Sequence, residues 1–165
     1  SGVRTPISYL PIGEVVSGFT LGTLVMLASY QVLTLRFEPL VLLWSIPPFI
    51  GIGLIMMTNN CCDIEKDIGA NLKTLPGLLG RPRTVKLYHG AIFAWMISIC
   101  VIVLVFFTKG WVILPFLLLA AHPLGRQLLA NPLVHKTRGP AFGTITSLNI
   151  CLGTFYAAAL IVSAL

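Results

Sequence analysis

The sequence predicts an all-α, polytopic membrane protein with about five transmembrane helices. Hydrophobic residues make up 56% of the 165 residues and charged residues only 10%, a balance far from that of a soluble domain. Five apolar stretches are each long enough, at about 20 residues, to cross the hydrocarbon core of a bilayer. These stretches are residues 13–34, 40–58, 90–107, 111–130 and 141–165.

The first two stretches differ in regularity. Residues 13–34 begin with Glu14, whose carboxylate is favoured at a helix start by the helix dipole, with a role in a site as the alternative. Residues 40–58 contain Pro47 and Pro48, which remove two backbone donors. We therefore expect a kink there, and we expect neighbouring helices or water to satisfy the freed carbonyl groups.

A charged segment, residues 59–84, follows the second stretch and holds three of the five acidic and four of the eleven basic residues. On a helix that continues out of the second stretch, Asn59, Asp63 and Asp67 follow one another at i, i+4, and Asn60 lies on the same stripe. Such oxygen ligands suit Mg²⁺, which takes one or two carboxylates and adds water and phosphate oxygens. Ordinary solvated loop charges are the alternative interpretation.

The last three stretches follow the charged segment. Tyr88 precedes them and is typical of a ring that settles at the membrane interface. Residues 90–107 and 141–165 are long apolar runs, and Asn149 in the second is expected to hydrogen-bond a neighbouring helix. Residues 111–130 contain a proline and two ionisable side chains in their second half, so this half should reach the interface or face the protein interior.

Basic residues are distributed unequally between the two sides of the predicted membrane. If every stretch spans, the side that holds the N-terminus and the charged segment has nine Lys or Arg residues, and the other side has two. The nine are Arg4, Lys66, Lys73, Arg81, Arg83, Lys86, Arg126, Lys136 and Arg138, and the two are Arg36 and Lys109. We therefore expect a multi-pass plasma-membrane protein with the charged segment in the cytoplasm and the C-terminus outside. No basic, aromatic-lined face for nucleic acid is visible in the sequence.

The charged segment carries a recognisable signature. Its sequence "NNCCDIEKDIGANLKTLPGLLG", residues 59–80, resembles the second aspartate-rich signature of the UbiA superfamily of intramembrane aromatic prenyltransferases, N-N-x-x-D-x-x-x-D-x-x-x-G-x-x-T-L-x-x-x-L-G. "PIGEVVSGFTLG" from Pro11 and "KTRGPAFGTI" from Lys136 are weaker matches to other helix starts of that family. Asn71 stands where the signature has Gly, and Asn tolerates a left-handed conformation better than most residues.

This resemblance implies a nine-helix fold in which two aspartate-rich signatures face each other over a central cavity. The five stretches then correspond to helices five to nine, and only the second signature is found in these 165 residues. We therefore expect residues 1–165 to form the C-terminal part of a single prenyltransferase domain. We expect this part to be inactive alone and to need an N-terminal half as its partner.

The paired asparagines are similar to the branch that prenylates 1,4-dihydroxy-2-naphthoate in menaquinone biosynthesis. The resemblance implies Mg²⁺-dependent transfer of a polyprenyl group from polyprenyl diphosphate to this aromatic acceptor, which yields demethylmenaquinone, CO₂ and diphosphate. Asp63 and Asp67 are the expected metal ligands and, together with Lys73, the expected catalytic residues. The residues expected to bind the substrate diphosphate are Asn59, Asn60, Lys73 and Arg81. A membrane scaffold or assembly subunit without chemistry of its own and an enzyme for a different aromatic acceptor are the alternatives.

Overall fold

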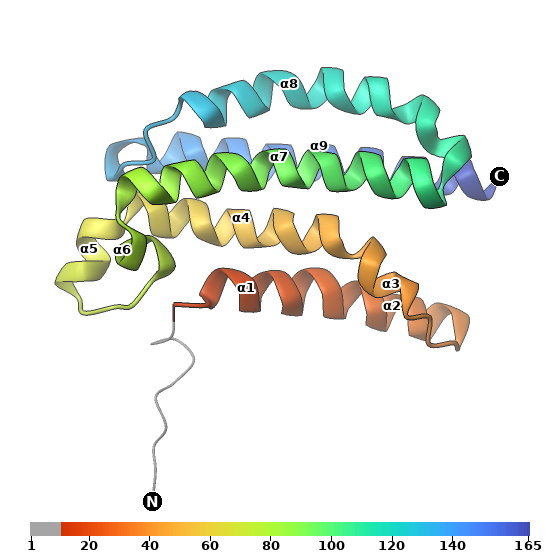
Figure 1. Ribbon diagram of the computed structural model, residues 1–165, viewed down its shortest axis with the longest axis horizontal. Coiled ribbons are helices and arrows are strands. Elements are labelled where there is room, and N and C mark those ends of the chain that lie inside the picture. Colours follow the sequence, from red (N-terminus) through yellow and green to blue (C-terminus); the bar gives the residue numbers. More distant parts are fainter. Residues whose placement is uncertain (1–10) are drawn as a thin grey trace, which may run out of the picture.

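The computed structural model of the chain describes residues 11–165, and this part contains helices and no strands. The long helices run side by side along one axis, as Figure 1 shows. Four helical runs are long and apolar enough to cross a membrane, and a shorter apolar helix accompanies them. The four runs are Gly13–Thr34, Arg81–Phe106, Thr108–Ala130 and His135–Ala164, and the shorter helix is Ile46–Cys62. The predicted all-α membrane architecture is confirmed. Arg4, one of the nine basic residues counted above, lies outside the described residues.

The first span approaches the centre of the bundle closely. It consists of α1 (Gly13–Ser17), the π-helical segment η2 (Gly18–Leu24) and α2 (Val25–Thr34). Gly18 and Gly22 lie against Phe49. A Cβ atom added to Gly18 would stand 2.5 Å from the Phe49 carbonyl oxygen, and one added to Gly22 would stand 2.7 Å from the Phe49 nitrogen. Two glycines four residues apart therefore allow backbone-to-backbone packing between two membrane helices. The sequence pattern alone did not predict the π-helical turn.

The second apolar stretch is broken where its prolines predict. It forms α3 (Leu40–Trp44) and α4 (Ile46–Cys62), which meet at Ser45, directly before Pro47 and Pro48. Pro48 has no N–H to donate to the carbonyl oxygen of Trp44, and the hydroxyl of Tyr156 in the last helix donates to that oxygen instead, at 2.9 Å. A neighbouring helix thus satisfies a freed carbonyl, as expected.

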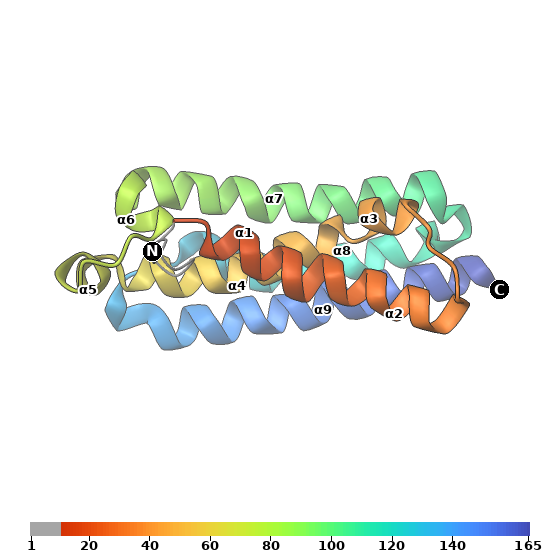
Figure 2. The ribbon, with the colours of Figure 1, turned by 90° about the horizontal axis from the view of Figure 1, so that it is seen from below.

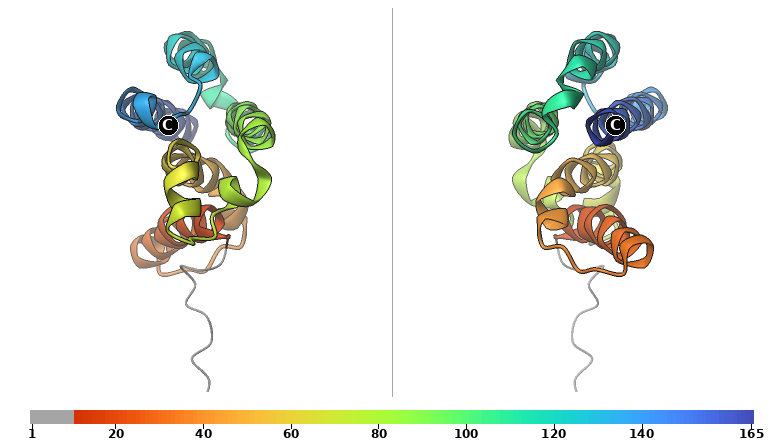
Figure 3. Two further views of the ribbon diagram at one scale, coloured as in Figure 1. Left: turned by 90° about the vertical axis from the view of Figure 1, so that its left-hand side faces the viewer. Right: turned by 90° about the vertical axis from the view of Figure 1, so that its right-hand side faces the viewer.

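Helix α4 lies at the centre of the bundle. It packs against α1 and η2 on one side and against α7 (Arg81–Phe106) and α9 (Arg138–Ala164) on the others, an arrangement visible in the end-on views of Figure 3. One link between α4 and α7 is a 2.8 Å hydrogen bond between Thr58 and Tyr88. Thr58 already donates to a carbonyl of its own helix, so Tyr88 is the donor. The expectation that the Tyr88 ring anchors in the membrane interface is wrong, because its side chain is fully buried within the protein.

Two helix boundaries differ from the hydropathy pattern. Helix α7 begins at Arg81 rather than at residue 90, and α9 begins at Arg138 rather than at residue 141. Hydropathy marks only the apolar part of a helix, whereas polar first turns continue into the interface. Helix α8 (Leu114–Ala130), preceded by the 3₁₀ turn η3 (Thr108–Ile113), runs through Pro123 without a break.

The charged segment is largely helical and sits at one end of the bundle. It contains the short helices α5 (Ile64–Gly69) and α6 (Leu75–Leu79). Figures 1 and 2 show both helices at the same end as the start of α7 and the connection from α8 to α9, whereas the C-terminus lies at the opposite end. That connection includes the turn η4 (His135–Thr137). Residues from three separate parts of the sequence therefore meet at the charged end.

Candidate active site

Asp63 and Asp67 lie around the junction of α4 and α5. Asp63 ends α4 with φ −105° and ψ 14°, so the two helices are not one continuous rod. The Asp67 amide still donates to the Asp63 carbonyl oxygen at 2.9 Å, which preserves the predicted helical turn between them. Both residues are buried, with exposed fractions of 8% for Asp63 and 9% for Asp67. Two acidic groups are thus withdrawn from bulk water within one turn of chain.

The carboxylate of Asp63 is paired with side chains from the α8–α9 connection. Arg138 Nη1 lies 2.9 Å from Asp63 Oδ2, and His135 Nδ1 lies 3.0 Å from Asp63 Oδ1. Asn59 belongs to the same group, because its Oδ1 accepts a long hydrogen bond of 3.5 Å from Arg138 Nε. Each carboxylate oxygen of Asp63 has one protein partner and keeps a second acceptor position.

Asp67 is the less compensated of the two acids. Burial, and then the nearby negative charge of Asp63, raise the pKa of the Asp67 carboxyl above its usual value. Within residues 11–165, no three His, Cys, Asp or Glu side chains converge on one metal position. Two carboxylates alone fit Mg²⁺, which commonly completes its shell with water and phosphate oxygens. The pair therefore has the donor chemistry for such an ion.

The two asparagines point to different parts of the site. Asn59 lies toward Arg138, whereas Asn60 Nδ2 donates to Glu14 Oε1 of the first span at 2.8 Å. Glu14 is buried, with 6% of its surface exposed, and it makes no side-chain cap to its own helix. Glu14 thus lies in the first turn of α1, where the helix dipole favours a carboxylate, and it also contacts a residue of the predicted site, so the two interpretations are compatible. The four side chains predicted to share one stripe therefore do not all face the same neighbour: Asn59 faces α9 and Asn60 faces α1.

Lys73 and Arg81 differ in availability. Lys73 is exposed in the turn between α5 and α6, and it forms no ion pair with any described residue. Asn71 in the same turn adopts φ 54°, which confirms that this position needs a left-handed conformation. Arg81 Nη2 instead contacts both carboxylate oxygens of Glu65, at 2.7 and 2.8 Å. These bonds hold the pKa of the Glu65 carboxyl below its usual value.

Two of the cavities that adjoin this group of residues differ in character. A polar one of about 300 Å³ is lined by Cys62, Asp63, Glu65, Lys66 and His135. A nearly apolar one of about 310 Å³ lies between α1, α4, α6 and α7. Its lining residues are Glu14, Val15, Phe49, Ile50, Gly53, Leu54, Met57, Leu75, Leu87 and Ala91. One cavity thus has charged residues from the end of α4 and from α5 in its wall, and the other has mainly apolar residues.

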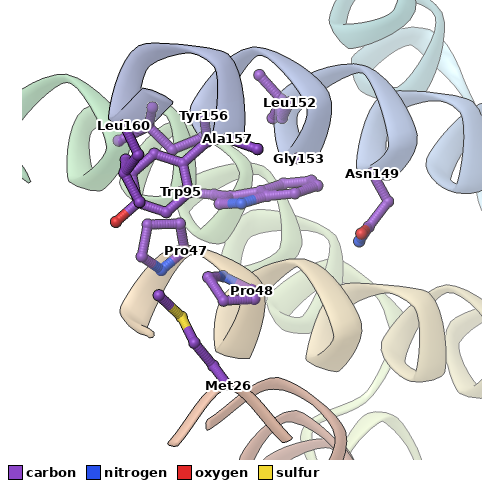
Figure 4. A pocket seen from close by; sticks show the side chains of 11 residues that line it. Met26, Pro47, Pro48, Trp95, Asn149, Leu152, Gly153, Tyr156, Ala157 and Leu160 are labelled. Atoms are coloured by element: carbon purple, nitrogen blue, oxygen red, sulfur yellow. The ribbon is translucent and has the colours of Figure 1, made fainter. Parts of the chain in front are cut away.

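A third cavity, of about 250 Å³, lies farther along the bundle. Figure 4 shows Trp95 of α7 and Asn149 and Tyr156 of α9 around Pro47 and Pro48 of α4. The Nδ2 group of Asn149 is buried and has no hydrogen-bond partner among the described residues. The expected interhelical bond from this group is therefore wrong. The cavity offers apolar walls and the unpaired amide donor of Asn149.

Sequence reasoning did not identify two residues that the structure brings to the site, and it left the role of Glu14 open. Arg138 and His135 contact Asp63 from positions more than 70 residues away, and Glu14 contacts Asn60 across 46 positions. The available signals were the weaker family matches at "KTRGPAFGTI" and "PIGEVVSGFTLG", which contain Arg138 and Glu14. No spacing rule links such distant positions.

Comparisons with known proteins place the chain in a family. The UbiA prenyltransferase family matches residues 5–148. The 1,4-dihydroxy-2-naphthoate octaprenyltransferase of Bacillus subtilis is 32% identical over 117 residues, which cover 71% of this chain and 38% of that protein. UbiA prenyltransferase domain-containing protein 1 of Danio rerio is 26% identical over 91% of this chain and 43% of its own length. Its Rattus norvegicus counterpart is 29% identical over 90% and 42%. The chain thus spans about two fifths of the length of these relatives. The comparison with solved structures gave no match.

Proposed function

The chain belongs to the UbiA prenyltransferase family, and on that premise we propose that it forms part of an enzyme that transfers a polyprenyl group from polyprenyl diphosphate to 1,4-dihydroxy-2-naphthoate in the presence of Mg²⁺. The observation that carries this proposal is the pair of buried carboxylates, Asp63 and Asp67, at the charged end of an apolar helical bundle. The identity of the aromatic acceptor is supported by the paired asparagines and by the Bacillus subtilis relative.

The first requirement of the reaction is to bind the diphosphate. Asp63 and Asp67 would hold Mg²⁺, which neutralises negative charge on the departing diphosphate. Lys73, which is exposed and unpaired within the described part of the chain, reaches the same end and supplies a further positive charge. Asn59 and Asn60 orient phosphate oxygens or bound water through their amide groups. Arg81 is already bonded to Glu65, so we leave it out of this group.

The second requirement is to protect the reacting carbon. As the bond from the allylic carbon to the diphosphate lengthens, positive charge grows on carbon, and water would quench it. The apolar cavity beside Glu14 borders the end of α4 that carries the aspartates, so it is suited to the first isoprene units. The ring then attacks this carbon, and the acceptor loses its carboxylate as CO₂ when the new bond forms. We place the charged site on the cytoplasmic side of the plasma membrane, following the distribution of basic residues.

The test is a transfer assay on the intact protein in membranes, with labelled prenyl diphosphate, 1,4-dihydroxy-2-naphthoate and Mg²⁺. We expect a prenylated product that requires Mg²⁺ and falls at least about a hundredfold in Asp63→Asn and Asp67→Asn, because each removes one anionic ligand. Glu38→Gln is a matched control, because it also removes one negative charge but lies in the connection from α2 to α3. Product formation with hydroxybenzoate instead of the naphthoate would reassign the acceptor.

A non-catalytic scaffold gives a different result. It would bind prenyl diphosphate without Mg²⁺, and Asp63→Asn would not weaken the binding. We further propose that these 165 residues, assayed by themselves, bind the diphosphate without transferring it. The family resemblance implies two aspartate-rich signatures, and residues 11–165 present one. Turnover by the 165 residues alone would contradict this part of the proposal.

A further inference from the structure

The guanidinium of Arg81 connects three segments that are distant in sequence. Its Nη2 donates to the two carboxylate oxygens of Glu65, which lies in α5. Its Nη1 donates to the carbonyl oxygen of Cys61 in the last turn of α4, at 3.1 Å, and to that of Leu133 in the α8–α9 connection. These four bonds use four of the five N–H groups of a guanidinium. Little donor capacity remains for a substrate.

The segments that Arg81 joins are those that form the surroundings of Asp63. Cys61 lies two residues before Asp63, and Leu133 lies two residues before His135. His135 and Arg138 are the residues that contact the Asp63 carboxylate. Arg81 therefore binds the backbone of the segment that carries Asp63 and the backbone of the segment that carries its two partners. It does not contact Asp63 itself.

The backbone at Leu133 needs such support. Leu133 has φ 49°, a left-handed conformation that is strained for a residue with a Cβ atom. Its side chain is fully buried, so the connection cannot relax by turning this residue outward. The bond from Arg81 to the Leu133 carbonyl oxygen helps to hold this conformation.

From these contacts we propose that Arg81, together with Glu65, is a positioning element for the reaction: it fixes the α4–α5 junction against the α8–α9 connection and thereby orients Asp63. This proposal rests on the proposed function. It assigns Arg81 no contact with the diphosphate. A Lys ammonium cannot form the same fork of bonds. Arg81→Lys therefore keeps the positive charge but loses the simultaneous bonds to Glu65 and to the two backbone carbonyl groups.

The two possible roles of Arg81 predict that Glu65→Gln changes different kinetic constants. If Arg81 positions Asp63, Glu65→Gln weakens the same contact and should lower kcat in the same direction as Arg81→Lys, with KM for prenyl diphosphate little changed. If Arg81 instead binds the diphosphate, Glu65→Gln releases it toward the substrate and should lower that KM. We expect a kcat loss of about ten- to a hundredfold for Arg81→Lys and a smaller loss for Glu65→Gln.

A double-mutant cycle sharpens this comparison. Because the two residues act through one contact, Glu65→Gln combined with Arg81→Lys should lower kcat no more than Arg81→Lys alone. Arg83→Lys is the matched control, because Arg83 is exposed on the first turn of the same helix and should leave kcat and KM unchanged. Additive losses in kcat, or a raised KM for prenyl diphosphate with normal kcat in Arg81→Lys, would overturn the proposal.

A second readout does not depend on activity. Cys61 and Cys62 are buried beside the Arg81 contacts, with exposed fractions of 1% and 0%. If Arg81 holds this junction closed, Arg81→Lys in the intact protein should speed modification of these thiols by a water-soluble maleimide about tenfold, as measured by peptide mass spectrometry. Unchanged modification in Arg81→Lys would overturn the positioning role even if the protein showed no transfer. Faster modification without any transfer by the intact wild-type protein would support the contact while contradicting the proposed function.

Discussion

Asp63 shows how a buried charge is compensated. It is buried, and its two carboxylate oxygens are paired with Arg138 and His135. Removal of one partner of a buried charge leaves the other without compensation. Because the Arg138 side chain is 42% exposed, water moderates this penalty.

We expect Arg138→Gln to lower the free energy of unfolding by about 1 kcal/mol in the absence of divalent ions, because Asp63 loses its fixed cation. Added Mg²⁺ should reduce this deficit, since the ion takes over the compensation. Thermal unfolding in detergent, with EDTA and with Mg²⁺, measures both effects. Arg126→Gln is the control, because Arg126 lies exposed on α8 without an ion pair to a described residue. An equal deficit with and without Mg²⁺ would contradict this account.

The sequence identified the residues of the charged segment but not their partners. Asp63 and Asp67 could be named because a signature of fixed spacing follows an apolar stretch. The contacts of Asp63 with Arg138 and of Asn60 with Glu14 could not, because they depend on how three separate helices meet. Nor could sequence reasoning foresee that Arg81 is bonded to Glu65, since both residues lie in one charged segment with several possible pairings.

Among the helices, the break between α3 and α4 depends on one interhelical hydrogen bond. Tyr156→Phe removes the donor to the Trp44 carbonyl oxygen, which Pro48 cannot serve. We expect a loss of about 1 kcal/mol in the free energy of unfolding, which is typical of one hydrogen bond between membrane helices. Tyr30→Phe is the control, because the Tyr30 hydroxyl has no hydrogen bond to a described residue. Equal losses in the two variants would show that the bond contributes nothing specific.

The contact of the first span with α4 gives a second prediction for the helices. Gly22→Ala should destabilise the bundle by about 1–3 kcal/mol, because the new Cβ atom would stand 2.7 Å from the backbone nitrogen of Phe49. Gly143→Ala in α9 adds the same methyl group in open space and should be neutral or stabilising by up to about 1 kcal/mol. Thermal unfolding of the two variants in detergent provides the comparison. Unfolding of Gly22→Ala at the wild-type temperature would contradict a close backbone contact at Gly22.

Helix existence was easier to predict than helix limits. Long apolar runs specify membrane helices by composition alone, and Pro47 with Pro48 correctly predicted the break in the second one. The early start of α7 at Arg81 was missed because its first turns are polar. The burial of Tyr88 was missed because its position relative to α4 depends on tertiary packing.

At the scale of the whole molecule, the charged end and the opposite end of the bundle should face different compartments. The connection from α2 to α3 contains Phe37, which is 60% exposed, and the end of α5 is followed by the exposed Ala70. In intact cells, Phe37→Cys should react with a membrane-impermeant maleimide, and Ala70→Cys should react only after the membrane is permeabilised. The reverse pattern would invert the assigned orientation.

The first span is the least enclosed of the membrane-crossing runs. In its most apolar part 17% of the residues are buried, against 28% in each of the other three, and its main packing partner is α4. Yet this run supplies Glu14, the acceptor for Asn60, and one wall of the apolar cavity. If this single helix moved away sideways, α4, α7, α8 and α9 could stay packed against one another. Loss of this one helix would therefore remove the acceptor for Asn60 and a wall of the cavity while the other described helices stayed packed, and the proposed transfer would stop.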